Sequence, residues 1–209
     1  TASITAKGVT GSFTAVSKIY DATTATTVLN RALTGVLAGD VGSVSLTGGT
    51  GTFADKNVGT GKTVTLVGAT LTGGAAAGNY TLTSVTTTTA DITVRGITGS
   101  FTAANKVYDG NNQAGVATRT LTGVLGTDVV SLINGTATFA DKNVGTGKTV
   151  TLVGATLSGA DVLNYSLLSV GTTTANITAK GITGNFTVTA SKVYDGNTSA
   201  NVLTRTLTG

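Results

Sequence analysis

Six amino acids are missing from this sequence, and their absence limits the chemistry that the chain can perform. It contains no Cys, His, Met, Trp, Pro or Glu. The usual general bases, thiol nucleophiles and soft metal ligands are therefore missing, which leaves Asp, Lys, Tyr and hydroxyl groups for any catalysis. We expect the chain not to be an enzyme, and we assign it no catalytic, cofactor-binding or metal-binding residue.

Long apolar runs and a leader segment are also missing. The lack of Cys excludes disulfides, so apolar burial and strand pairing must stabilise the fold. No apolar run reaches about 18 residues, and we therefore expect no membrane insertion of this segment. The chain has neither an initiator Met nor a charged-then-apolar start, so we expect an excerpt or a processed product.

Charge is sparse and evenly spread. The net charge of +4 comes from 13 Lys and Arg against 9 Asp, with only five Tyr and five Phe. Nucleic-acid binding requires basic patches interleaved with stacking aromatic residues, and neither is visible in the sequence. We expect no nucleic-acid partner.

A possible phosphate-binding loop ends in Gly61-Lys62-Thr63 within the segment NVGTGKTVTLVGATL, residues 57–71. Such a loop needs a glycine five residues before this tripeptide and a helix that starts at the lysine. Lys56 stands at the glycine position, and the residues after Lys62 are mostly β-branched and alternate in polarity. We predict a hairpin loop followed by a strand, and no nucleotide site.

What the sequence does contain is an internal repeat. The motifs KIYDA, KVYDG and KVYDG place Tyr20, Tyr108 and Tyr194 at spacings of 88 and 86 residues. The block TFADKNVGTGKTVTLVGATL occurs at 52–71 and again at 138–157. A period of about 86 residues exceeds that of solenoids and suits a sandwich domain of seven to nine strands.

The repeat boundaries follow from the parity of the apolar residues. Ile92 and Val94 have even numbers whereas Ile97 and Phe101 have odd ones, so the inward face switches near Arg95-Gly96. Similar switches divide the chain into residues 1–7 (last strand of a preceding repeat), 8–95 (repeat 1), 96–180 (repeat 2) and 181–209 (start of a further repeat). No flexible linker separates these parts, which predicts a semi-rigid rod.

Within one repeat the pattern is all-β. For repeat 2 we predict turns at Asp109-Gly110-Asn111, at Asn134-Gly135 and at 143–147, where Gly145 or Gly147 should have positive φ. The predicted strands are 97–103, 116–122, 129–133, 136–140, 148–153, 165–170 and 173–179.

The combination of KVYDG, TFADKNVGTGK, NYSL and ITAK resembles the YDG-type repeat, related to MBG repeats, of large bacterial surface adhesins such as filamentous-haemagglutinin-like exoproteins. The resemblance covers the whole chain. It implies tandem Ig-like β-sandwich repeats that serve as stalk modules. One departure is Ala22, which replaces the turn glycine of the other two copies and should strain that turn.

The resemblance implies a non-catalytic stalk or fibre segment of an extracellular adhesin or biofilm matrix protein, at the bacterial surface or secreted. The expected partners are neighbouring repeats of the same chain, with lateral self-association into filaments and surface glycans as further possibilities. An array of carbohydrate-binding modules is the alternative function. Exposed aromatic residues lining a groove would favour glycan binding, whereas buried tyrosines would favour the stalk.

Two recurring residue types invite a functional role but have a structural explanation. Asp21, Asp109 and Asp195 could bind Ca²⁺, yet each repeat carries few carboxylates, so we predict turn-capping side chains. Tyr80 and Tyr165 could stack on sugars. We predict instead corner tyrosines, with a buried ring and a hydroxyl bonded to the backbone.

Overall fold

The computed structural model describes residues 2–209, which form two compact units. Unit 1 contains the residues up to Gly99 together with Leu121–Ile133 and Thr156–Ser169, and unit 2 contains Ser100–Thr120, Asn134–Ala155 and Val170–Gly209. The division crosses repeat 2, so unit 1 holds all of repeat 1 together with three separate segments of the next repeat. The predicted boundary at residues 95–96 stays a prediction.

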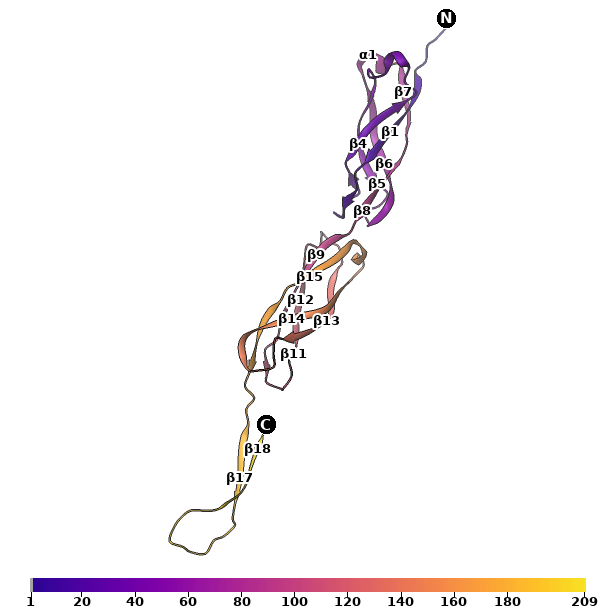
Figure 1. Cartoon of the computed structure of the whole chain (residues 1–209). Helices are drawn as coiled ribbons and strands as arrows, with labels where there is room; N and C mark the ends of the chain where they lie inside the picture. The colour runs from indigo at the N-terminus through magenta and orange to yellow at the C-terminus, as the bar shows by residue number, and fades with distance from the viewer. Residues whose placement is uncertain (1) are drawn as a thin grey trace. The chain divides into compact units, whose positions relative to one another are not determined.

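Repeat 1 consists of two sheets, which Figure 1 shows in indigo to magenta. The strand orders are β4-β1-β7 and β2-β8-β6-β5-β3, and β1 lies antiparallel to β4 but parallel to β7. The elements are β1 (Lys7–Ala15), β2 (Lys18–Ile19), β3 (Ala25–Thr26), β4 (Val28–Thr34), η1 (Ala38–Asp40), β5 (Ser45–Phe53), β6 (Gly59–Thr72), α1 (Gly74–Ala77), β7 (Tyr80–Val85) and β8 (Thr88–Thr93).

The core of repeat 1 lies between these two sheets. Phe13 of β1 packs in one buried cluster with Phe53 of β5, Val64 of β6 and Ile92 of β8. Along β6, Val64 and Leu66 are buried while the threonines beside them face solvent, as period-2 alternation requires. The chain is therefore all-β, as predicted, and repeat 1 is a β-sandwich.

Repeat 2 has the same order of strands. They form sheets β12-β9-β15 and β10-β16-β14-β13-β11, and the burial pattern of β13 matches that of β5. The elements are β9 (Arg95–Ala103), β10 (Lys106–Val107), β11 (Gln113–Ala114), β12 (Val116–Thr122), β13 (Ser131–Phe139), β14 (Gly145–Ser158), η2 (Val162–Asn164), β15 (Tyr165–Val170) and β16 (Thr173–Thr178).

One predicted hairpin is wrong. Asn134 and Gly135 do have positive φ, but they lie inside the single strand β13 instead of between two strands. The equivalent stretch of repeat 1 shows why the chain does not reverse there. Gly48 of β5 pairs with Ala69 of β6, and the next level along the strands holds Gly49 and Gly68. All three glycines are left-handed, and the register continues unchanged on both sides. Left-handed residues in both partners twist the two strands together, so neither has to turn back.

The connection between the first two repeats is as short as predicted. Only Val94 separates β8 from β9, and the buried side chains change from even to odd numbers between Ile92 and Ile97. The equivalent connection after β16 is longer, because β17 (Thr183–Val188) starts later than the switch at Lys180-Gly181 predicts. The first residues of β1 pair with β7, and residues 181–209 contain no equivalent of that partner strand. Instead β17 pairs only with β18 (Val202–Thr208).

Threonine mainly occupies the solvent face of the strands, as predicted. The hydroxyl oxygens of Thr102 and Thr118 lie 2.6 Å apart across β9 and β12, and those of Ser100 and Thr120 also lie 2.6 Å apart. Such cross-strand hydroxyl pairs stabilise a sheet by a few tenths of a kcal/mol up to about 1 kcal/mol each. The abundance of Thr is therefore explained by strand pairing.

The loop at residues 143–147 provides a test of the turn assignment. Gly147 has φ 59° and open space around its missing Cβ, whereas Gly145 does not have positive φ. We expect Gly147→Val to lower the free energy of unfolding by about 1–2 kcal/mol, because a side chain disfavours left-handed backbone. Urea denaturation measures this loss. Thr146→Val, at the exposed neighbouring position without positive φ, is the control and should stay near the wild-type value, and equal stability of both variants would contradict the assignment.

Candidate interaction site

The site lies where repeat 1 meets the residues of repeat 2 that belong to the same unit, unit 1. Repeat 1 contributes what we call its tyrosine end: Tyr20, Lys56, Asn57 and Val58. Repeat 2 contributes what we call its aspartate end: Leu125, Asp128, Asn164 and Tyr165. The equivalent residues of the other ends are Tyr108, Lys142, Asn143 and Val144 in repeat 2 and Leu37, Asp40, Asn79 and Tyr80 in repeat 1.

The KIYDA motif forms the turn that holds Tyr20. The ammonium of Lys18 donates to Asp21 Oδ1 (2.7 Å) and to the carbonyl oxygens of Thr23 (2.8 Å) and Ala25 (2.8 Å). Asp21 also caps its own turn by accepting from the Thr23 N–H (2.9 Å). Ala22 has φ 64°, so the residue in place of glycine is indeed held in the strained left-handed region.

The FADKNVGTGK motif forms the hairpin loop that carries Lys56. Asp55 accepts from the Asn57 N–H (2.8 Å) and from the ammonium of Lys62 (2.7 Å), which together close the loop. Lys62 lies in strand β6, as predicted, and its ammonium is committed to Asp55. The loop thus holds Lys56 and its two neighbours at the end of the sandwich.

The Asn-Tyr pair at the start of β15 holds the aspartate end together. The N–H of Leu125 donates to the hydroxyl of Tyr165 (3.0 Å), and that hydroxyl donates to Asp128 Oδ2 (2.7 Å). The Tyr165 side chain therefore links the loop before β13 to strand β15. The predicted corner tyrosine is confirmed, since its ring is buried and its hydroxyl is bonded to the backbone.

The carboxylate of Asp128 is the centre of the contact. Its side chain is 3% exposed, and it accepts from Tyr20 and Tyr165 (2.7 Å each) and from Lys56 (2.8 Å). The pKa of Asp128 is lowered to about 2, first by the Lys56 hydrogen bond and then by the hydrogen bonds from the two tyrosines, which together outweigh the desolvation that opposes them. The same hydrogen bond raises the pKa of Lys56. The buried charge is thus paired and fully hydrogen-bonded, which is the condition under which burial is tolerated.

Two tyrosine rings meet at the same point. The rings of Tyr20 and Tyr165 stand edge to face, with centroids 5.4 Å apart and an interplanar angle of 76°. Burial and, after it, the Asp128 hydrogen bond together raise the pKa of Tyr165 to about 12, and burial is also the main cause that raises the pKa of Tyr20. Both hydroxyls therefore remain donors to the carboxylate, and the ring pair contributes roughly 0.5–1.5 kcal/mol.

Asn164 makes a second polar link across the contact. It is 3% exposed, its Oδ1 accepts from the Val58 N–H (2.9 Å), and its Nδ2 donates to Asn57 Oδ1 (3.2 Å). The apolar residues continue across as well, because Ile97 and Tyr165 belong to the same buried cluster as Tyr20 and Ile92. The two repeats therefore share one continuous core at this contact.

The other residues that the sequence singled out have structural roles. Asp109 and Asp195 cap their turns by accepting from the N–H groups of Asn111 (3.1 Å) and Asn197 (3.2 Å), as predicted. Tyr80 has a buried ring, and its hydroxyl accepts from the Leu37 N–H (3.1 Å). Within residues 2–209, no group of three or more His, Cys, Asp or Glu side chains is placed to hold a metal ion.

Sequence reasoning missed Asp128 and Lys56. Each lies inside a repeated motif: Asp128 corresponds to Asp40 of the other repeat, and Lys56 corresponds to Lys142. Both nevertheless resemble ordinary charged loop residues. The signal that was available is the common recurrence of Leu-x-x-Asp, Asp-Lys-Asn and Asn-Tyr in every complete repeat. The contact itself joins residues 108 positions apart and so is not visible in any local pattern.

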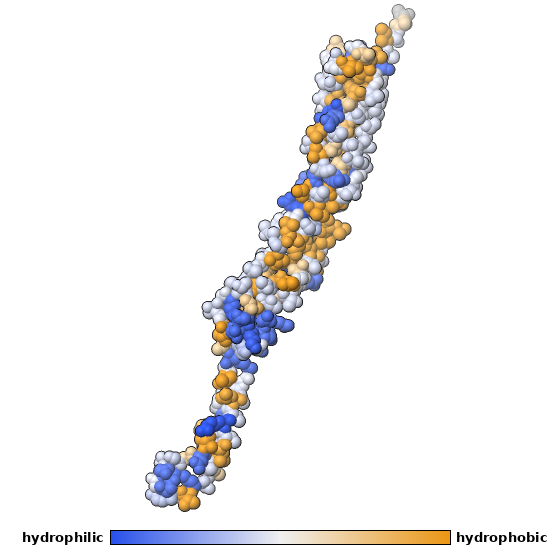
Figure 2. Space-filling model, in the orientation of Figure 1, coloured by the Kyte–Doolittle hydropathy of each residue, from blue (hydrophilic) through white to orange (hydrophobic). Residues whose placement is uncertain are grey.

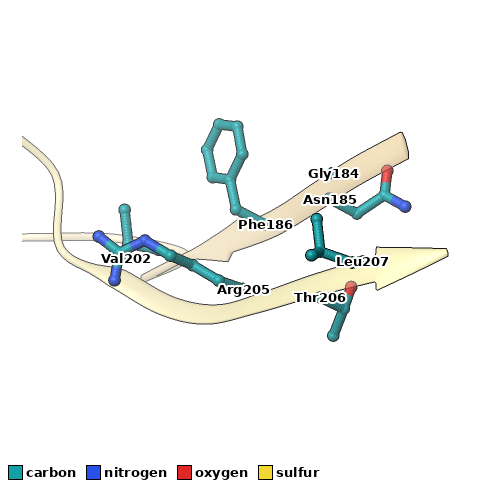
Figure 3. A pocket seen from close by; sticks show the side chains of 7 residues that line it. All are labelled: Gly184, Asn185, Phe186, Val202, Arg205, Thr206 and Leu207. Carbon is teal, nitrogen blue, oxygen red and sulfur yellow. The ribbon is translucent and has the colours of Figure 1, made fainter. Parts of the chain in front are cut away.

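The hollow on the hairpin β17–β18 is an uncovered core surface. Figure 3 shows Phe186, Val202 and Leu207 beside Arg205 on the two strands. Phe186 is 68% exposed, whereas its equivalents Phe13 and Phe101 are each 5% exposed inside their sandwiches. This hollow is therefore the inner face of a two-stranded sheet, and we assign it no ligand.

The surface and the helices add little to the site. Figure 2 shows hydrophilic residues in small groups among intermediate and hydrophobic ones on the face in view. Among residues 2–209, no helix is long and apolar enough to cross a membrane, and α1 spans only Gly74–Ala77.

The two repeats have the same strand order and the same sequence motifs, and they contact each other around Asp128. These features define an all-β tandem-repeat protein. The family model of the YDG domain matches residues 5–90 and again residues 88–175. These matches cover most of the chain, which therefore belongs to the YDG domain family, as the repeated motifs indicated. No curated protein and no solved structure matches the chain.

Asp128 predicts a specific dependence of stability on pH. Its pKa is lowered from the ordinary 3.8 to about 2, so it stabilises the fold above pH 3.8 and loses this effect as the pH falls through 2. We expect Asp128→Asn to cost about 2 kcal/mol at pH 7 and almost nothing near pH 2. Urea denaturation followed by tyrosine fluorescence at several pH values measures the difference.

Asp141→Asn is the control for this experiment, because Asp141 pairs with Lys148 at an exposed position, with 52% of its side chain accessible. Its cost should be well below that of Asp128→Asn at neutral pH. A cost of Asp128→Asn that stays constant from pH 7 to pH 2 would contradict the buried carboxylate.

Proposed function

We propose that this chain is a non-catalytic stalk or fibre segment of an extracellular bacterial adhesin or biofilm matrix protein. The observation that carries the proposal is the contact around Asp128. A module whose task is to hold something at a distance needs a junction that resists bending. The contact supplies one through a buried ion pair, two tyrosine hydrogen bonds and a shared apolar cluster.

The covalent connection supports the same role. A single residue, Val94, separates the last strand of one repeat from the first strand of the next. A flexible linker would let successive repeats sample many directions, and reach would then grow only with the square root of their number. A strand-to-strand connection with a fixed side-chain contact makes reach grow nearly in proportion to repeat number.

The placement of aromatic residues favours the stalk over the array of carbohydrate-binding modules. Glycan-binding surfaces usually present aromatic rings to solvent. In repeats 1 and 2 the three tyrosines Tyr20, Tyr80 and Tyr165 and the four phenylalanines Phe13, Phe53, Phe101 and Phe139 are buried, and Tyr108 is half-buried. Those rings are committed to cores and to the contact between repeats.

Small-angle X-ray scattering on the 209-residue chain tests the proposal. We expect a narrow distribution of sizes for the wild type. Asp128→Ala removes the acceptor of three hydrogen bonds, so it should release bending between repeats 1 and 2, broaden that distribution and lower the mean radius of gyration. Circular dichroism confirms that the variant keeps its strands.

Asp141→Ala is the control and should scatter like the wild type, because the bonds that it removes, to Lys148 and to the Asn143 N–H, lie outside the contact around Asp128. Identical scattering by all three chains, or a wild type that samples as broad a range as Asp128→Ala, would remove the stiff junction and with it the stalk. Saturable binding of the chain to a glycan would favour the alternative function.

A further inference from the structure

We propose that repeat 1 is a tension-resisting module, in which strands β1 and β8 are arranged to withstand a pull along the chain in shear. The chain enters the repeat through β1 and leaves it through β8, so these two strands receive any tension that the chain carries. The inference rests on the proposed function only in taking the chain to be under tension. It adds resistance to stretching, whereas the contact around Asp128 concerns bending.

The load enters and leaves at opposite ends of the sandwich. Lys7, the first residue of β1, pairs with Tyr80, and its N–H donates to the Asn79 carbonyl (2.8 Å). Thr93, the last residue of β8, pairs with Ile19 of β2, the strand that follows β1. The nine residues of β1 span roughly 30 Å between these two ends. A pull between the ends therefore acts along the strands, as the positions of N and β8 in Figure 1 show.

Strand β1 lies in the middle of its sheet, between β4 and β7. It pairs with β7 over residues 7–11 and with β4 over residues 10–15, so it is held along its whole length. Thr83 of β7 adds a side-chain bond, in which its hydroxyl donates to the Val9 carbonyl (2.9 Å). Because β1 has a partner on each side, it cannot be peeled away from a free edge of the sheet.

Strand β8 has a similar position in the other sheet, between β2 and β6. It runs antiparallel to β6 over residues 88–92 and parallel to β2 over residues 92–93. The carbonyl of Thr93 also accepts from the Tyr20 N–H (2.9 Å), which extends the pairing to the end of the strand. Both strands that receive the load are therefore central strands.

Asp91 fastens β8 to both of its neighbours. The register between β8 and β6 is irregular between Gly59 and Lys62, and Asp91 Oδ1 bridges this irregularity by accepting from the Gly61 N–H (2.7 Å). On the other side the Asp91 N–H donates to the Ser17 hydroxyl oxygen (2.9 Å). One residue in the middle of β8 thus links the strand to the β6 side and to the residues just before β2.

Repeat 2 makes the same two bonds with different side chains. Asn176 stands in place of Asp91, and its Oδ1 accepts from the Gly147 N–H (2.8 Å). The Asn176 N–H donates to Oδ1 of Asn105, which stands in place of Ser17 (2.7 Å). Because the bonds recur although the residues differ, fastening of the last strand is a shared property of the two repeats.

The direction of the pull decides how many bonds must break together. Hydrogen bonds of an antiparallel ladder run across the strands, so a pull along β1 and β8 loads a whole ladder at once. Phe13 of β1 and Ile92 of β8 must leave the buried cluster in the same step. A pull across the open end of a hairpin loads one pair of residues at a time instead. Forced unfolding is governed by the unfolding rate, so the pull along the strands meets the higher barrier.

Single-molecule pulling on the 209-residue chain tests the proposal. Because the chain contains no Cys, two introduced thiols define where the force is applied. Ala6→Cys with Val94→Cys places the handles at exposed residues just outside β1 and β8. Ser45→Cys with Thr72→Cys places them on the exposed pair at the open end of the β5–β6 hairpin.

At one loading rate, we expect repeat 1 to unfold at a several-fold higher force with handles at 6 and 94 than with handles at 45 and 72. Asp91→Ala should lower the force at 6 and 94, because it removes the bond to the Gly61 N–H. It should leave the force at 45 and 72 unchanged, because β8 does not carry the load in that geometry.

Arg31→Ala is the matched control for this variant. It also removes one side-chain hydrogen bond to the backbone, that to the Gly48 carbonyl (3.1 Å), but this bond joins β4 to β5 and involves neither β1 nor β8. The control should unfold at the wild-type force with handles at 6 and 94. Urea denaturation confirms that both variants are folded.

Equal forces in the two geometries, or a higher force at 45 and 72, would overturn the proposal, and so would equal forces for Asp91→Ala and Arg31→Ala at 6 and 94. The result is separable from that of the scattering experiment, because these handles load repeat 1 alone. A joint that bends freely beside a repeat that unfolds only at high force would remove the stiff stalk and leave this inference standing.

Discussion

A single buried carboxylate organises the contact between the two complete repeats. Asp128 brings a lysine and a tyrosine from one repeat to a tyrosine of the next, and the loop geometry on both sides serves to place those groups. An unpaired charge at this depth would be strongly destabilising, so the carboxylate tolerates only an arrangement that supplies its donors. The ion pair therefore contributes specificity of alignment, while the rings and the shared apolar cluster contribute most of the favourable free energy.

The sequence allowed most of the repeat architecture to be predicted, because strand content, turns and inward faces are local properties. The turn aspartates, the buried corner tyrosines and the strand position of Lys62 all followed from residue types at fixed spacings. The hairpin predicted at Asn134-Gly135 failed, since the same left-handed residues that favour a tight turn also fit a strand whose partner is left-handed at the same level. Which of the two forms depends on the partner strand, and that information is not local.

The contact site itself was not predictable, for a related reason. Tyr20 looks like a core residue of its turn, and Asp128 looks like a polar loop residue; only their proximity gives them a joint role. The structure explains the position of the repeated motifs. KVYDG and FADKNVGTGK build one end of each sandwich, and the Leu-x-x-Asp and Asn-Tyr pairs build the other. The longest unchanged block, residues 52–71 and 138–157, contains the loop of one end together with most of strands β6 and β14.

The one-residue connection at Val94 determines how such an array responds to force. If the Asp128 contact opens under tension, the two repeats cannot separate, because β8 and β9 leave almost no slack in the backbone between them. Opening therefore permits rotation at the joint but adds almost nothing to contour length. A joint whose contact has opened can bend but cannot lengthen until a sandwich itself unfolds, so tension passes through it from one repeat to the next.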